Sequence, residues 1–186
     1  MNEGHAAVCS SAEWAEHITG TVLPAALGAL DLGDEVLEVG PGYGASTTLL
    51  AATVPRLTAI EVDGALAVQL RQRFPAVTVV HGRGEDMPFA DGRFTAAVCF
   101  TMLHHVHSAE AQDALFAEVR RVLAPGAVFA GSDSVASARL HEFHSDDIYV
   151  PVDPGTLPDR LRAAGFHDVR VAVAETGEWF TFSARV

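Results

Sequence analysis

The stretch Val36-Leu-Glu-Val-Gly-Pro-Gly-Tyr-Gly-Ala45 determines how the rest of the chain is interpreted. It begins as a short apolar run and continues into glycines at alternate positions, 40, 42 and 44. Ser46-Thr-Thr-Leu-Leu-Ala-Ala52 then has the composition of a helix. Glycine lets the backbone turn tightly and approach a ligand closely, and the first N–H groups of a helix bind polar or anionic groups. We therefore predict a buried strand, a ligand-binding turn and the start of a helix.

Length and composition indicate one globular domain. The chain has 186 residues, of which 49% are hydrophobic and 19% charged, which is enough for one substantial core. Its net charge of −12, with arginine as the only strongly basic residue type, repels nucleic-acid backbones and anionic membranes. No apolar run approaches the roughly 20 residues that span a bilayer, and the N-terminus lacks the pattern of a signal peptide. We expect no nucleic-acid partner and no membrane partner.

The two cysteines, Cys9 and Cys99, are far apart and form no CxxC motif. Cys99 lies in an apolar run, where it is expected to be a small buried side chain. Nothing indicates a disulfide framework, so we expect a cytoplasmic protein.

Apolar periodicity predicts strands that alternate with helices along one domain, residues 1–186. Each strand is nearly continuous in apolar residues, which is typical of a parallel sheet covered on both faces, and a hairpin ends the chain. We expect a flexible tail at 1–11, an N-terminal cap helix at 12–30 interrupted by Pro24, and the core at 36–186, with 133–153 irregular. The expected strands are 36–40, 57–61, 77–81, 94–100, 127–130, 169–173 and 179–186.

Ligands of open α/β sheets bind outside the carboxyl ends of the strands. Glu61 lies at such an end, about 20 residues after the first glycine, where a carboxylate can accept both hydroxyls of a ribose. Gly40-x-Gly42-x-x-Ala45 also satisfies the permissive dinucleotide fingerprint. A nicotinamide nucleotide and other adenosine ligands both remain open on these residues alone.

Six motifs in order resemble those of the class I S-adenosylmethionine-dependent methyltransferases, in particular the small-molecule branch. Together they extend over most of the chain. They are Val36-Leu-Glu-Val-Gly-Pro-Gly-Tyr-Gly44, Ala59-Ile-Glu-Val-Asp63, Gly84-Glu-Asp-Met-Pro-Phe-Ala-Asp-Gly-Arg-Phe94, Phe100-Thr-Met-Leu-His-His-Val106, Glu118-Val-Arg-Arg-Val-Leu-Ala-Pro-Gly-Ala127 and Leu161-Arg-Ala-Ala-Gly-Phe166.

This resemblance implies a Rossmann-like three-layer α/β sandwich with a seven-stranded, mostly parallel sheet of order 3-2-1-4-5-7-6 and one antiparallel strand. It implies methyl transfer from S-adenosylmethionine to a small-molecule acceptor by in-line displacement, with S-adenosylhomocysteine as product. One alternative is a cofactor-binding module or sensor without transferase activity. A nicotinamide-dependent oxidoreductase is disfavoured by Pro41, by the loop at 84–94 and by the absence of lysine.

The resemblance also implies a set of cofactor-binding residues. The glycine turn would pack on the methionine and ribose, Glu38 would order that turn, and Glu61 would hold the ribose hydroxyls. The family often has Asp where this chain has Arg83, which cannot accept a hydrogen bond from adenine. Either Glu85 or Asp86 would substitute, with Asp86 preferred, or the adenine would be held mainly by packing. The full set is Glu38, Gly40, Pro41, Gly42, Tyr43, Gly44, Glu61, Val62, Gly84, Glu85, Asp86, Phe100 and Thr101.

Two adjacent histidines, His104 and His105, follow the fourth strand at the expected mouth of the site. A hydroxyl or protonated amine acceptor requires a base, and imidazole titrates in the right range. We predict both as catalytic candidates, with local packing as the alternative for each. His141 and His144 are further candidates from the segment 133–153, where a solvated loop is the simpler explanation.

The same segment offers a possible metal site. His-x-x-His spacing with nearby carboxylates can bind a divalent cation. Because such polar loops are more often exposed, we expect no metal ion. The residues considered are Asp133, His141, His144, Asp146 and Asp147.

Only the N-terminal helix, with Trp14, and the segment 133–153 are available to form an acceptor pocket. Through cation–π contacts, Tyr43 could place its ring near the sulfonium and Trp14 could close over the acceptor, although core packing is the simpler explanation for Trp14. Both segments are short. We therefore expect a small acceptor, or a site completed by a second copy of the chain in a homodimer.

Overall fold

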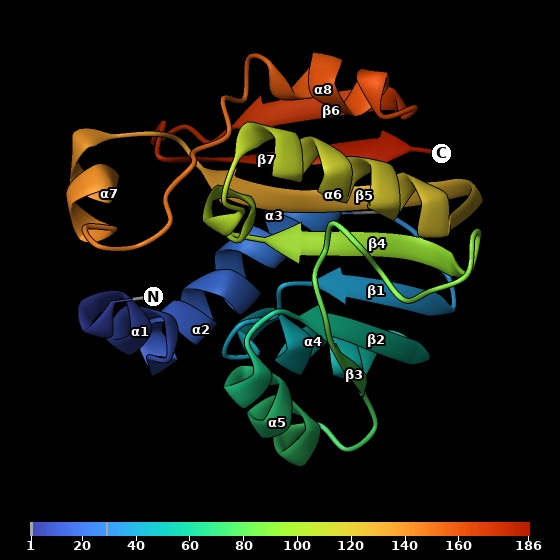
Figure 1. Ribbon diagram of the computed structural model, residues 1–186, viewed down its shortest axis with the longest axis horizontal. Coiled ribbons are helices and arrows are strands. Elements are labelled where there is room, and N and C mark those ends of the chain that lie inside the picture. Colours follow the sequence, from blue (N-terminus) through green and yellow to red (C-terminus); the bar gives the residue numbers. More distant parts are fainter. Residues whose placement is uncertain (1, 29) are drawn as a thin grey trace.

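A computed structural model describes residues 2–28 and 30–186. Its seven strands form one sheet of order β3-β2-β1-β4-β5-β7-β6, in which β7 runs antiparallel to both of its neighbours. Figure 1 shows this sheet with helices on both sides, and the predicted fold class and strand order are confirmed. The strands are β1 (Glu35–Val39), β2 (Arg56–Glu61), β3 (Thr78–His81), β4 (Phe94–Phe100), β5 (Leu123–Ser134), β6 (His167–Val173) and β7 (Trp179–Arg185).

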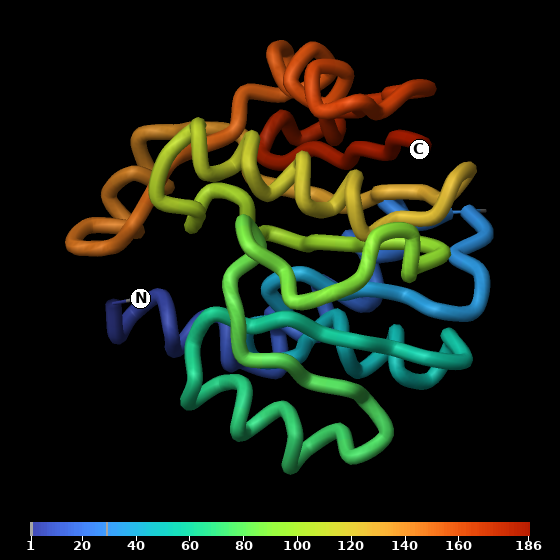
Figure 2. Tube along the Cα trace, turned by 45° about the vertical axis from the view of Figure 1, so that its right-hand side comes forward, coloured from blue at the N-terminus to red at the C-terminus, as the bar shows by residue number. Residues whose placement is uncertain are grey.

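Alternate strand residues enter two separate hydrophobic cores, as strand geometry requires. In β1, Leu37 belongs to the core beneath α6 and α8, whereas Val36 belongs to the core beneath the N-terminal helices, α4 and α5. Figure 2 shows the two helical layers on either side of the sheet. The helices are α1 (Glu3–Cys9), α2 (Ala12–His17), η1 (Ile18–Val22), α3 (Leu23–Leu27), α4 (Ala45–Thr53), α5 (Gly64–Arg73), η2 (Leu103–His105), α6 (Ala109–Val122), α7 (Ala138–Phe143) and α8 (Leu157–Ala163).

The N-terminal segment differs from the expected flexible tail, because residues 3–9 form helix α1. The Asn2 side chain accepts a hydrogen bond from the His5 N–H at 2.8 Å, and the His5 ring is buried. An N-terminal cap and one docked side chain compensate for the small, polar composition that suggested flexibility. The interruption expected near Pro24 takes the form of the π-helical turn η1 between α2 and α3.

The segment 133–153 is not entirely irregular, because it contains the short helix α7. Ser137 caps it by accepting a hydrogen bond from the Leu140 N–H at 3.2 Å. No residue of α7 is buried, so it lacks the apolar face that would have indicated a helix in the sequence. In the described part of the chain, no helix has both the length and the apolar character needed to cross a membrane.

Candidate functional site

The carboxyl ends of β1, β2 and β4 border a cavity of about 570 Å³. These ends lie at the left of the sheet in Figure 1, on the side of α1 and α7. The cavity is therefore at the edge where parallel α/β sheets bind ligands. Of the residues predicted from the sequence, those that line it are Gly40, Pro41, Gly42, Tyr43, Glu61, Val62, Gly84, Glu85, Phe100, Thr101 and His105.

The glycine turn after β1 needs glycine for two different reasons. Gly44 has φ 79°, and a Cβ there would lie 2.7 Å from Cε2 of Phe74. Gly42 has φ 55°, but a Cβ there would meet no atom within 4 Å. Gly44 thus allows α5 to pack against the turn, whereas Gly42 keeps the backbone open toward the cavity.

Glu38 orders this turn from below and does not line the cavity. Its buried carboxyl accepts hydrogen bonds from the Ser46 hydroxyl at 2.5 Å and the Thr47 hydroxyl at 2.7 Å. Burial raises the pKa of Glu38 to about 7, although these two hydrogen bonds work to lower it. Glu38 therefore connects β1 to the first turn of α4.

Glu61 joins the ends of two neighbouring strands. One of its oxygens accepts from the Gly42 N–H at 3.0 Å, and the other accepts from the Asp63 N–H at 2.9 Å. Each carboxylate oxygen has a second lone pair, so the side chain can still accept hydrogen bonds from a ligand in the cavity. Its backbone contacts hold it in place before any ligand binds.

The loop after β3 places Glu85, and not Asp86, at the cavity. Asp86 is exposed and is absent from the cavity lining. Arg83 donates to the Glu85 carboxylate at 2.6 Å, and the His107 ring lies 3.6 Å from the same oxygen. Asp86, the acceptor preferred from the sequence, is therefore outside the cavity lining, whereas the Glu85 side chain is at the cavity.

The two histidines predicted as catalytic occupy different environments. His104 is buried, and its Nδ1 is in close contact with the fully buried Asp133 carboxylate. The same carboxylate accepts a hydrogen bond from the backbone N–H of His104 at 3.1 Å. His105 lines the cavity, and its Nδ1 lies 3.2 Å from the Ile148 carbonyl oxygen. Burial, together with the neighbouring histidines, lowers the pKa of His105 to about 3.

Several residues outside the predicted cofactor-binding and catalytic sets also line the cavity. Cys9, Trp14 and Ile18 approach from the N-terminal helices, and Asp147 and Ile148 approach from the segment after α7. Burial raises the pKa of the Cys9 thiol to about 11, so this side chain stays protonated. The sequence suggested Trp14 for an acceptor pocket and Asp147 for a metal site, whereas Cys9, Ile18 and Ile148 have no spacing that would mark them as site residues.

The metal ligands considered from the sequence are not brought together as a group. Asp133 pairs with His104, and His141 is exposed on α7. His144 instead lies beside His5 and His105. No spacing rule joins these three positions in the sequence.

Comparisons with known proteins agree with this geometry. Residues 37–131 match the family described as "Methyltransferase domain". A Mycolicibacterium smegmatis protein named as a probable S-adenosylmethionine-dependent methyltransferase is 30% identical over 141 residues, which are 72% of this chain and 52% of that protein. The chain therefore spans about half the length of that curated relative.

Two further similarities are more limited. The ribosomal RNA small subunit methyltransferase A of Chlorobium phaeobacteroides is 49% identical over 51 residues, which cover 27% of this chain and 20% of that protein. The second is a solved structure, the complex of the Haloferax volcanii Trm112 methyltransferase activator with a methyltransferase. One chain of that complex has the same fold as this chain, with a TM-score of 0.78 at 14% identity, and the match covers 98% of this chain and 94% of that one.

The family match decides against the nicotinamide-dependent alternative. The chain belongs to the class I S-adenosylmethionine-dependent methyltransferase family.

Proposed function

We propose that the chain binds S-adenosylmethionine in the cavity and transfers its methyl group to a small-molecule acceptor. The observation that carries this proposal is the convergence of Gly42, Glu61 and Thr101, from three adjacent strand ends, on one cavity that also contains His105. In the transfer, a lone pair of the acceptor bonds to the methyl carbon while the carbon–sulfur bond breaks. Sulfur keeps the electron pair, S-adenosylhomocysteine forms, and the acceptor proton leaves to a base or to water.

The cofactor would lie along the ends of β1 and β2. Glu61 would accept the ribose hydroxyls, because its carboxylate is buried at the cavity wall and already oriented by two backbone N–H groups. Glu85 would face the adenine amino group in place of Asp86. Preorganised acceptors of this kind lose little freedom on binding.

A small acceptor fits the remaining space. The cavity of about 570 Å³ must also hold the cofactor, and Trp14 and Ile18 from the N-terminal helices and Ile148 from the segment after α7 also line it. The net charge of −12 disfavours a polyanionic acceptor such as RNA. The similarity to the ribosomal RNA methyltransferase covers only 27% of this chain, so it supports cofactor binding more than acceptor choice.

His105 is the better placed of the two predicted catalytic histidines. It borders the cavity, whereas His104 is buried against Asp133 and would act as a positioning residue for the η2 turn. A pKa of about 3 leaves the His105 ring uncharged at neutral pH. It also makes the ring a weak proton acceptor on its own, since general bases work best with a pKa near the working pH.

Two measurements test the proposed function. Calorimetry should show one S-adenosylmethionine or S-adenosylhomocysteine bound per chain and no binding of NAD; binding of NAD alone would overturn the cofactor assignment. Protein incubated with methyl-labelled S-adenosylmethionine and a cell extract should then transfer label to the small-molecule fraction. Label in RNA would contradict the acceptor class, and cofactor binding without any transfer would favour the sensor alternative.

A further inference from the structure

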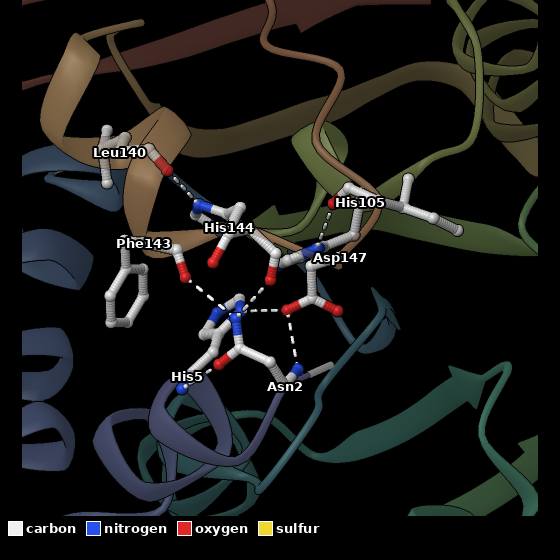
Figure 3. A network of polar contacts seen from close by, with 9 residues as sticks. Asn2, His5, His105, Leu140, Phe143, His144 and Asp147 are labelled. Carbon is white, nitrogen blue, oxygen red and sulfur yellow. Dashed lines mark hydrogen bonds and ion pairs between the residues drawn. The ribbon is translucent and has the colours of Figure 1, made fainter.

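Three histidines from distant parts of the chain lie together beside the cavity. His5 comes from α1, His105 from η2, and His144 directly follows α7. One ring nitrogen from each lies within 4.8 Å of those of the other two. Figure 3 shows the three rings grouped between the N-terminal helix and the segment after α7. Such a group suits a metal ion, because imidazole is the side chain that most often ligates transition metals.

The Nδ1 atom of each ring faces a hydrogen-bond acceptor. His5 Nδ1 lies 3.0 Å from the Asp147 carboxylate, and His144 Nδ1 lies 2.7 Å from the Leu140 carbonyl oxygen. His105 Nδ1 lies 3.2 Å from the Ile148 carbonyl oxygen. Since each of these partners only accepts, each Nδ1 must carry the hydrogen, and Nε2 keeps its lone pair. Acceptors at the second nitrogen are the usual support for histidines that ligate a metal.

The lone pair on one of the three Nε2 atoms accepts no hydrogen bond from the residues that the structure describes. His144 Nε2 is buried and has no hydrogen-bond partner among residues 2–28 and 30–186. A buried polar atom without a partner costs free energy and calls for an explanation.

We propose that His5, His105 and His144 bind a divalent transition-metal ion, with zinc the best match to three imidazole ligands. Tetrahedral zinc with Zn–N bonds of about 2.1 Å brings its nitrogens to about 3.4 Å from one another. The 4.8 Å limit in the structure therefore requires only small side-chain rotations. Three histidines with one open position are the ligand pattern of catalytic rather than structural zinc.

The fourth position of the ion would face the cavity, since His105 and Asp147 both line it. This consequence rests on the proposed function. It favours an acceptor that presents a hydroxyl, because a divalent metal lowers the pKa of a coordinated hydroxyl. The ion would thereby supply the activation that the weakly basic His105 lacks.

In the experiment, tag-free protein is first treated with a chelator. It is then titrated with zinc chloride and, in a separate sample, with cobalt chloride. Wild-type protein should bind one equivalent of zinc, and its cobalt complex should show the strong visible absorption of a tetrahedral site. His5→Ala and His144→Ala should weaken zinc binding by at least roughly 100-fold, more than the loss typical of an outer-shell change. His141→Ala is the matched control, because His141 lies exposed on α7 outside the cluster, and it should bind zinc as the wild type does.

Wild-type protein that binds no zinc, or a His144→Ala variant that binds it equally well, would overturn the proposal. Circular dichroism establishes that each variant is folded, and the wild-type titration decides the question even if a variant is not. Calorimetry with S-adenosylhomocysteine separates the two proposals. Zinc binding without cofactor binding would refute the proposed function alone, whereas cofactor binding without zinc binding would refute the metal site alone.

Discussion

The end of the cavity proposed for the cofactor, the cofactor end, consists of backbone turns and carboxylates, whereas the histidine end is the group of His5, His105 and His144 beside the cavity, of which His105 lines it. At the cofactor end, Glu38 and Glu61 bond to partners between 2 and 19 residues away in the sequence. At the histidine end, His5 bonds to Asp147 across 142 residues. The first end is thus organised by local contacts around two strand ends, and the second forms only when distant segments dock.

This difference implies that the two ends respond to different kinds of substitution. The cofactor end depends on backbone conformation and on two buried carboxyls, so changes there should alter the turn or its hydrogen bonds. The histidine end depends on side chains from separate elements, so changes there should weaken docking. Substitutions in each end therefore either separate the two ends or show that they are coupled.

Asp133→Ala should cause the largest loss of stability. The fully buried carboxylate pairs with the His104 ring and accepts the N–H groups of His104 and Ser134. Its removal leaves these groups buried without a partner, at a cost of about 3–5 kcal/mol in the free energy of unfolding. Urea denaturation measures this loss, and Asp159→Ala, at an exposed side chain of α8, is a control that should change stability by less than about 0.5 kcal/mol.

The same Asp133→Ala variant tests whether the two ends are independent. Asp133 is outside the cavity lining, so the folded variant should bind S-adenosylhomocysteine within about twofold of the wild type, as expected for sites that share no partners. A large loss of cofactor affinity would show that the histidine end and the cofactor end form one unit.

Gly44→Ala and Gly42→Ala should separate packing from binding within the cofactor end. An alanine at either position pays about 1–2 kcal/mol for its left-handed backbone. At residue 44 the new Cβ also collides with Phe74, and the crowding adds about 1–3 kcal/mol. Denaturation should therefore show a clearly greater loss of stability for Gly44→Ala than for Gly42→Ala. Gly42→Ala should mainly impair S-adenosylhomocysteine binding. Equal losses of stability would contradict the packing role of Gly44.

Glu38→Gln should remove a pH dependence of stability. The pKa of the folded Glu38 carboxyl is raised from 4.5 to about 7, so the folded state holds this proton more tightly than the unfolded state. The resulting stabilisation is present below about pH 4.5 and is lost as the pH rises through 7, by about 3 kcal/mol in all. Denaturation of both proteins between pH 5 and pH 8 should show that the stability of Glu38→Gln rises relative to that of the wild type as the pH increases. A stability difference that does not change with pH would contradict a buried neutral carboxyl.

The glycine turn and the carboxylate beside it could be located from the sequence because their contacts are local. The glycines at 40, 42 and 44 and the carboxylate at Glu61 lie at fixed distances from strand ends, and strand ends are recognisable from apolar runs. The seven-strand order was implied by the resemblance to the methyltransferase family, and the structure confirms it. Glu38, Gly44 and Asp86 are outside the cavity lining. For Asp86, a shift of one residue in an irregular loop decides which side chain faces the cavity.

The histidine end could not be predicted, because nothing in the sequence relates residue 5 to residues 105 and 144. The contact depends on helix α1, which a single cap at Asn2 and the docking of His5 define. Helix α7, which positions His144, has no buried residue and therefore no apolar periodicity. Only a three-dimensional structure brings these elements to one place.

The affinity of S-adenosylhomocysteine for Glu61→Ala, measured by calorimetry beside the wild type, tests the central assignment most directly. A lost hydrogen bond to a charged group costs about 1.5–3 kcal/mol, so the dissociation constant should rise by roughly 10- to 150-fold. Glu61→Gln keeps an acceptor oxygen, so its dissociation constant should lie between those of the wild type and Glu61→Ala. Equal affinity of wild type and Glu61→Ala would contradict the placement of the cofactor at the ends of β1 and β2.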